Sequence, residues 1–134
     1  MKFLSLLMVF VFGATFLLGL KILLVDDSKD NFENTQTLSD ALNSVNIEHD
    51  MFDAASELET PDLNGLLEYD VVIWHTINDG VDLLFWEGQD QENETLKSYL
   101  SEGKILWLIG NDFLFDRHAT GVTFGAGSFE YDFL

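Results

Sequence analysis

The stretch KILLVDD, residues 21–27, decides the fold class of this chain. It contains the uninterrupted apolar run ILLV, and a short run of this kind between polar residues is typical of a buried β-strand. The strand ends in two adjacent carboxylates, Asp26 and Asp27, and a polar turn follows them. This pattern predicts the first strand of an α/β sheet.

Downstream of this strand, the sequence predicts an amphipathic helix over about 32–44, because apolar and small residues recur there at three- and four-residue spacings. These residues are Phe32, Thr35, Leu38, Ala41, Leu42 and Val45. The next segment, NIEHDMFDA at 46–54, predicts a short second strand. We expect Ile47 and Met51 to share one face of that strand and His49 to point into solvent.

Three further patterns complete the predicted sheet. The continuous apolar run at 71–74 predicts a central parallel strand, since a strand with one wet face would alternate. ENETLKSYLSEG at 92–103 predicts a helix with Leu96, Tyr99 and Leu100 inward and Gly103 at its end, and KILWLIG at 104–110 predicts another strand. The rhythm predicts a flavodoxin-like three-layer α/β sandwich, with a mostly parallel sheet of about four to five strands in the order 2-1-3-4.

Residues 1–20 form a separate leader, which is apolar and uncharged between Lys2 and Lys21. This pattern is typical of a secretory signal peptide. We therefore expect an exported protein, in the periplasm, at the cell surface or outside the cell, with one α/β domain over 21–134. The run is also about as long as a membrane span and no A-x-A motif precedes Lys21, so a membrane anchor over 3–20 remains an alternative. The absence of cysteine excludes a lipoprotein anchor and disulfides.

The charge balance narrows the classes of partner. The formal net charge is −18, and all 24 acidic residues follow the leader. A surface this acidic repels phosphate backbones, which argues against nucleic acid as a partner. Three interpretations stay open, namely cation binding, solubility in a salty medium, and a well-solvated acidic exterior with no specific role. With 47% hydrophobic and 13% aromatic residues, the chain is not expected to be disordered.

The C-terminal segment 111–134 is rich in glycine and aromatic residues. Its aromatic side chains must pack somewhere, because each one buried is worth about 1.5–3 kcal/mol. We expect GSFEYDFL, 127–134, to return to the domain as an edge strand or extended arm, with its aromatic residues on one side and Glu130 and Asp132 on the other. If the chain is instead the first part of a longer protein, we expect these aromatic side chains to be exposed for a missing C-terminal region or a protein partner, and the isolated chain to self-associate through them.

Ligands of open parallel sheets bind at the carboxyl ends of the strands, so the residues that follow each strand make the candidate site. Nearly all of them offer oxygen ligands. They are Asp26, Asp27, His75, Asn78, Asp79, Asn111 and Asp112, with Arg117 in the last loop. Ca²⁺ and Mg²⁺ prefer such oxygens, which gives Asp26, Asp27, Asp79 and Asp112 as candidate metal ligands. The alternative is that no cofactor binds and these residues cap helices and form Asx turns.

His75 ends an apolar strand, where a catalytic base would need an adjacent nucleophile. The chain has no cysteine and no G-x-S-x-G motif, which favours a structural hydrogen bond from His75 to a neighbouring loop. A serine or threonine hydroxyl within reach of His75 would argue for catalysis. Arg117 is expected to pair with an acid or to hold an anion. Residues 93–95, N-E-T, match the N-glycosylation pattern.

One family resemblance lies at the start of the domain. ILLVDDSKDN at 22–31 resembles the opening of response-regulator receiver domains, in which the acids at the places of Asp26 and Asp27 hold Mg²⁺. In receivers the third strand ends in the phosphorylated aspartate, and His75 stands in that place here. The lysine that receivers carry near the end of a fifth strand has no counterpart. A receiver-like domain would therefore be degenerate.

A second resemblance covers nearly everything from residue 21 onward. YDVVIWHTINDG at 69–80 and LKSYLSEGKILWLIGNDFLFD at 96–116 resemble the class I glutamine amidotransferase-like superfamily, in particular non-catalytic domains of large exported bacterial proteins. In active members, a G-x-C-x-G turn after this strand presents the nucleophile. Asp112, or Asn111 one register away, stands at the cysteine position here, and bulky residues follow where small ones leave room for an oxyanion hole. The resemblance implies the fold without thiol chemistry.

These patterns together predict a non-catalytic, exported α/β interaction or accessory domain. The first alternative is a metal-dependent hydrolase of saccharides or esters, with the four aspartates as ligands and His75 as the base. The second alternative is the degenerate receiver-like domain.

Overall fold

The computed structural model of the protein describes residues 19–29, 33–76, 82–86, 93–111, 113–115, 117–118 and 120–134. Its strands are β1 (Ile22–Asp27), β2 (Asp50–Asp53), β3 (Val71–Thr76) and β4 (Ile105–Ile109). Its helices are α1 (Asn34–Ser44), α2 (Ala54–Glu57), α3 (Leu63–Leu67), α4 (Glu94–Ser101) and α5 (Phe129–Phe133).

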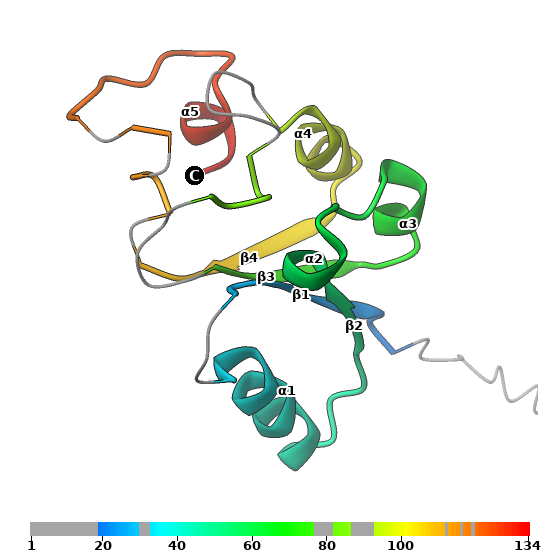
Figure 1. The fold of residues 1–134 in the computed structure, drawn as a ribbon. Helices are drawn as coiled ribbons and strands as arrows, with labels where there is room; N and C mark the ends of the chain where they lie inside the picture. The colour runs from blue at the N-terminus through cyan, green and yellow to red at the C-terminus, as the bar shows by residue number, and fades with distance from the viewer. Residues whose placement is uncertain are drawn as a thin grey trace, which may run out of the picture.

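The four strands form one parallel sheet in the order β2-β1-β3-β4, with helices on both faces (Figure 1). This confirms the predicted flavodoxin-like α/β fold and its strand order. The two central strands, β1 and β3, have the same burial pattern, with three consecutive buried residues. Continuous apolar runs are what a strand covered on both faces requires, which is why these two patterns identified the centre of the sheet.

Local sequence signals explain where the helices begin and end. Asn93 is the N-cap of α4, and its side-chain oxygen accepts a hydrogen bond from the backbone N–H of Leu96. Gly103 follows the helix with a φ of 76°, a left-handed conformation that glycine adopts at little cost. In α4, Leu96 and Tyr99 are buried and Leu100 is half-buried, as predicted.

The predicted second strand is shorter than expected. β2 begins at Asp50, so Ile47 precedes it and does not share its face with Met51. His49 is also not simply solvated, because its Nε2 lies 2.7 Å from the Ser39 hydroxyl of α1. The histidine therefore links the segment before β2 to the helix that crosses beside it.

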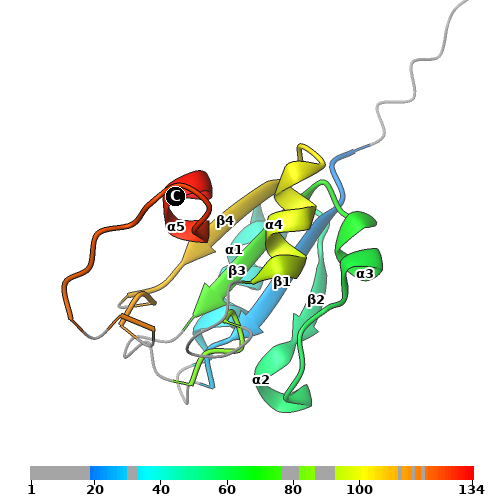
Figure 2. The same cartoon turned by 90° about the horizontal axis from the view of Figure 1, so that it is seen from above.

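One face of the sheet, which we call the crowded face, is covered by α2, α3, α4, α5 and the segment 82–86 (Figures 1 and 2). The strands contribute alternate residues to this core, and Phe85 of the 82–86 segment lies at its centre with no exposed surface. The Phe85 ring makes edge-to-face contacts with four aromatic rings, namely Trp74, Trp86, Phe113 and Phe129. Such contacts add to the free energy of burial.

The opposite face, which we call the open face, is packed by α1 alone among the described helices (Figure 1). Its buried core consists of Leu24, Ile73 and Leu42 of α1. The strand register places Met51, Leu24, Ile73 and Trp107 in one row across this face. The row is covered in the middle and uncovered at its ends, since Met51 is 47% and Trp107 53% exposed.

The C-terminal segment does return to the domain, but the predicted edge strand or arm is wrong. Residues 129–133 form helix α5, with Ser128 as N-cap accepting a hydrogen bond from the backbone N–H of Tyr131. In a helix, Phe129 and Phe133 share a face, and their ring centroids lie 5.6 Å apart. Tyr131 points outward and is 61% exposed, whereas Glu130 is buried.

None of the helices in the described ranges is long and apolar enough to cross a membrane. The predicted leader lies almost entirely outside the described residues, which begin at Gly19. The alternatives of a cleaved signal peptide and an uncleaved anchor thus both remain predictions.

Candidate functional site

Asp27 ends β1 and points into the crowded face. Its carboxylate accepts three hydrogen bonds, from Trp74 Nε1 at 3.1 Å, from Leu84 N at 2.9 Å and from Phe85 N at 2.7 Å. The residue is 1% exposed. The carboxylate thus fastens the 82–86 segment over the sheet, which brings Phe85 into the core.

Two opposing effects act on the pKa of the Asp27 carboxyl group. Burial raises the pKa of the Asp27 carboxyl above its ordinary value, because the charged form loses its hydration. The N–H donors of Leu84, Trp74 and Phe85 oppose this by stabilising the carboxylate, but the effect of burial is larger.

Asp26 precedes Asp27 in the same strand, so the two side chains point to opposite faces of the sheet. Asp26 Oδ1 accepts hydrogen bonds from the backbone N–H and the hydroxyl of Ser28, which is an Asx turn. The adjacent acids therefore do not converge on one site. Each is used in its own set of internal hydrogen bonds.

His75 lies opposite Asp26 in the ladder between β1 and β3. Its Nδ1 is 2.7 Å from Thr35 Oγ1, and Thr35 Oγ1 is 3.5 Å from the Ser28 hydroxyl. Asp26, Ser28, Thr35 and His75 thus form one polar chain between the sheet and the start of α1. The hydrogen-bonding partner of His75 lies in a helix rather than in a loop. Thr35 is only 1% exposed, so its hydroxyl is closed to a substrate.

The turn after β4 carries the pattern that resembles a nucleophile elbow. Gly110 packs directly against Thr76 at the end of β3, and a Cβ at position 110 would collide with the Thr76 hydroxyl. Glycine is therefore required for the close approach of the two strand ends. Asn111 follows and is exposed. Asn78, Asp79 and Asp112, also predicted at this rim, lie outside the described residues.

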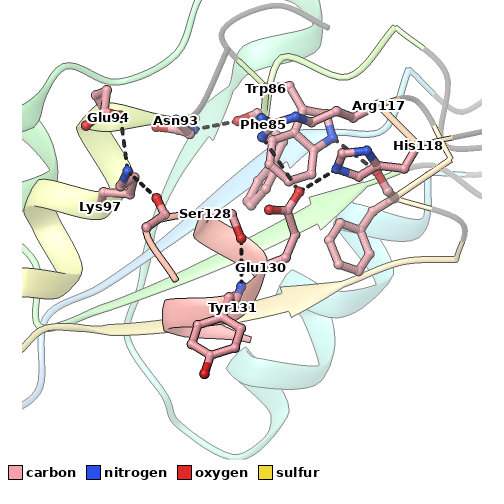
Figure 3. A network of polar contacts seen from close by, with 12 residues as sticks. Phe85, Trp86, Asn93, Glu94, Lys97, Arg117, His118, Ser128, Glu130 and Tyr131 are labelled. Carbon is pink, nitrogen blue, oxygen red and sulfur yellow. Dashed lines mark hydrogen bonds and ion pairs between the residues drawn. The ribbon is translucent and has the colours of Figure 1, made fainter. Parts of the chain in front are cut away.

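Arg117 lies in a second cluster, which holds the C-terminal helix (Figure 3). Its guanidinium is 5.1 Å from the centre of the Trp86 ring and 3.6 Å from Glu130 Oε1. His118 Nε2 is 2.7 Å from the same carboxylate oxygen. The side chain of Glu130 is 2% exposed, so α5 brings a buried carboxylate to two basic residues.

The neighbouring contacts in Figure 3 extend this anchoring. Lys97 of α4 donates to the carbonyl oxygen of Gly127 at 3.1 Å and pairs with Glu94 at 3.2 Å. Asn93 Nδ2 donates to the carbonyl oxygen of Phe85. Asn93 is 2% exposed, so the residue of the N-glycosylation pattern is used inside the fold.

Sequence reasoning named Arg117 but missed Glu130, which it placed outward on the assumption of a strand. The missed signal was Ser128, a residue with a strong preference for helix N-caps. With Ser128 as the cap, the helical period turns Phe129 and Phe133 to one side.

No group of three or more histidine or acidic residues within the described ranges is placed to hold a metal ion. A hollow of about 590 Å³ lies between the start of β1 and the segment before β2, lined by residues that include Lys21, Glu48 and His49. It is at the amino ends of the strands, opposite the predicted rim.

Comparison of the chain with known protein families, with curated proteins and with solved structures finds no match.

Proposed function

We propose that the chain is a non-catalytic α/β domain of an exported protein, which serves as an interaction or accessory module. The observation that carries this proposal is that the Asp27 carboxylate is buried and hydrogen-bonded within the fold. A metal ligand or catalytic acid needs a lone pair or proton directed at an open site. The Asp27 carboxylate is enclosed and satisfied by three internal donors.

The pairing of His75 with Thr35 meets the condition under which the sequence would argue for catalysis, and the burial of Thr35 answers that argument. A hydroxyl beside an imidazole is the arrangement of an activated nucleophile, but a nucleophile must reach its substrate. Thr35 is buried between α1 and the sheet, where it also contacts Ser28. Its position suits a structural bridge that holds α1 against the strand ends.

The export part of the proposal rests on the leader and on the charge. The apolar stretch after Lys2 has the composition of a signal peptide, and a domain with 24 acidic residues is suited to an exposed, salt-rich setting. The resemblance to amidotransferase-like domains without a nucleophile fits the same proposal.

A metal titration tests the non-catalytic assignment. We expect Ca²⁺, Mg²⁺ and Mn²⁺ to leave the thermal unfolding midpoint unchanged beyond the general effect of salt, because binding to the native state would raise it. NaCl at equal ionic strength is the control. A saturable rise that disappears in Asp26→Asn would contradict the proposal, and this variant changes a half-buried surface turn rather than the core.

A hydrolase assay addresses the Thr35–His75 pair. We expect no turnover of simple carboxylate esters or aryl glycosides by the full chain. Should turnover occur, Thr35→Val and the exposed control Thr37→Val from the same helix decide its origin. Activity lost in Thr35→Val alone would assign catalysis to this hydroxyl and overturn the proposal.

A further inference from the structure

β4 is an edge strand with an unusual surface. It pairs with β3 on one side and has no second strand neighbour among the described residues. Ile105 is 54% and Trp107 53% exposed on the open face. The strand ILWLI contains no charged residue in a chain of net charge −18. Natural edge strands are usually protected by charges, proline or bulges, and β4 has neither a charge nor a proline.

The other edge strand of the sheet, β2, is protected by charged side chains. β2 has the sequence DMFD, and its two acidic residues, Asp50 and Asp53, are both exposed. Two copies of that edge would repel each other. The contrast makes β4 the edge through which two strongly acidic chains can approach.

The backbone of β4 offers a defined set of free groups. Ile105 N donates to the carbonyl oxygen of Asp70, which shows that the backbone groups of Ile105 face β3. In a parallel ladder, alternate residues bond to the same neighbour, so Trp107 and Ile109 also face β3. The N–H and C=O groups of Leu106 and Leu108 therefore point away from the sheet.

The sequence of β4 is a palindrome centred on Trp107. A two-fold axis through an antiparallel strand pair brings position i of one chain opposite position j of the other, and j opposite i. Centred on Trp107, such an axis places Ile105 opposite Ile109 of the second chain and Leu106 opposite Leu108. Every outward N–H and C=O of both strands then faces a partner.

We propose that β4 is a homodimerisation edge, which pairs antiparallel with β4 of a second copy of this chain around Trp107 and joins the two sheets into one. This rests on the proposed function and names the partner of the interaction module. The two Leu106–Leu108 pairs exchange the backbone hydrogen bonds. Trp107 lies opposite its own copy in a non-hydrogen-bonded pair, in which the side chains are closest.

The chemistry of the open face favours this occupant over an unrelated one. The paired strands bring together apolar side chains on both faces and no like charges within the strand pair. α1, which flanks this surface, carries Asp40 as its single charged residue. One strand pair is a small interface, so we expect association at about 1–100 µM rather than at nanomolar concentration.

Disulfide trapping tests the geometry, because the native chain has no cysteine. We expect the full chain with Trp107→Cys to form oxidised dimers, since non-hydrogen-bonded pairs have Cα atoms about 4.5 Å apart, within disulfide reach. Ile105→Cys alone is the matched control, because its two copies would lie roughly 14 Å apart along the strands. A mixture of Ile105→Cys and Ile109→Cys should give mixed dimers. Equal trapping of all single variants, or none, would overturn the proposal.

Sedimentation of the full chain supplies a second, independent readout. Trp107→Lys should raise the dimer dissociation constant about 30-fold or more, as expected for a central aromatic residue replaced by a charge. Met51→Lys places the same charge on the same face at the far edge and should leave it unchanged. A chain that stays monomeric would contradict the dimer, and so would equal dissociation constants for Trp107→Lys and Met51→Lys. The β4 edge would then bind a strand of a different protein. That result would not touch the non-catalytic assignment, which the metal titration and hydrolase assay decide.

Discussion

The described helices and loops cover the two faces of the sheet to different extents. The crowded face carries twelve buried residues of one core cluster, and polar anchors at Asp27 and Glu130 fasten segments far apart in the sequence over it. The open face has a core cluster of three buried apolar residues and one described helix. Because a parallel sheet is stable when both faces are covered, the difference indicates that the crowded face supplies most of the stability of this domain, and the proposed association belongs to the edge strand β4.

The largest effect is expected from emptying the centre of the crowded face. Phe85→Ala should reduce the free energy of unfolding by about 3–5 kcal/mol, because it removes a fully buried ring and leaves a cavity. Phe115→Ala is the control, since this ring is 50% exposed. Urea unfolding followed by circular dichroism measures both. A loss below about 1 kcal/mol for Phe85→Ala would show that this face is not the main core.

A smaller loss is expected from the core of the open face. Leu42→Ala removes a side chain that is 9% exposed and packs on Leu24 and Ile73. We expect about 2 kcal/mol, at the low end for such truncations, because the half-covered site lets neighbours and water fill the space. A cost equal to that of Phe85→Ala in the same unfolding experiment would remove the distinction between the faces.

The buried hydroxyl of Tyr99 makes the free energy of unfolding depend on pH in the alkaline range. Burial, with a smaller contribution from the nearby charge of Asp70, raises the pKa of the Tyr99 hydroxyl from 10.0 to about 12. Because the folded state keeps this proton longer than the unfolded state, its contribution to stability is complete below pH 10 and is lost as the pH rises toward 12. Tyr99→Phe should cost about 1 kcal/mol at neutral pH, since its hydroxyl donates to the Ile105 carbonyl.

The measurement is the free energy of unfolding of the two proteins at several pH values. The difference between wild type and Tyr99→Phe should narrow above pH 10. A constant difference across that range would mean that the hydroxyl titrates alike in both states.

The smallest effect on stability is expected at the open edge. Trp107→Lys should change the unfolding free energy of the monomer by no more than about 0.5 kcal/mol, because a side chain that is 53% exposed contributes little to the core. The measurement belongs at low protein concentration, where dimers do not contribute. A loss of several kcal/mol there would show that Trp107 is a core residue of the monomer.

The sequence revealed the elements whose patterns are local and strong. The apolar runs of β1 and β3 and the capped helix α4 were predicted because each carries its own periodicity or terminal residues. Helix α5 was missed because Phe129 and Phe133 fall on one side both in a strand and in a helix of five residues. Glu130 and Tyr131 distinguish the two, because Glu130 is buried and Tyr131 points outward.

The site could be predicted less well than the fold. Asp27 was correctly placed at a strand end, but its hydrogen-bonding partners at Leu84 and Phe85 come from more than fifty residues away. The contact of Glu130 with Arg117 and His118 likewise depends on how the C-terminal segment folds back. Such pairings are set by tertiary packing, which no local pattern encodes.

Amide hydrogen exchange along β4 tests most directly whether the outer edge of this strand pairs with a second copy of the chain. The N–H groups of Leu106 and Leu108 point outward, whereas that of Trp107 bonds to β3 and serves as the internal control. With rising protein concentration, protection of Leu106 and Leu108 should increase while that of Trp107 stays high. Protection of Leu106 and Leu108 that is absent at every concentration, or already complete in the dilute monomer, would contradict the account.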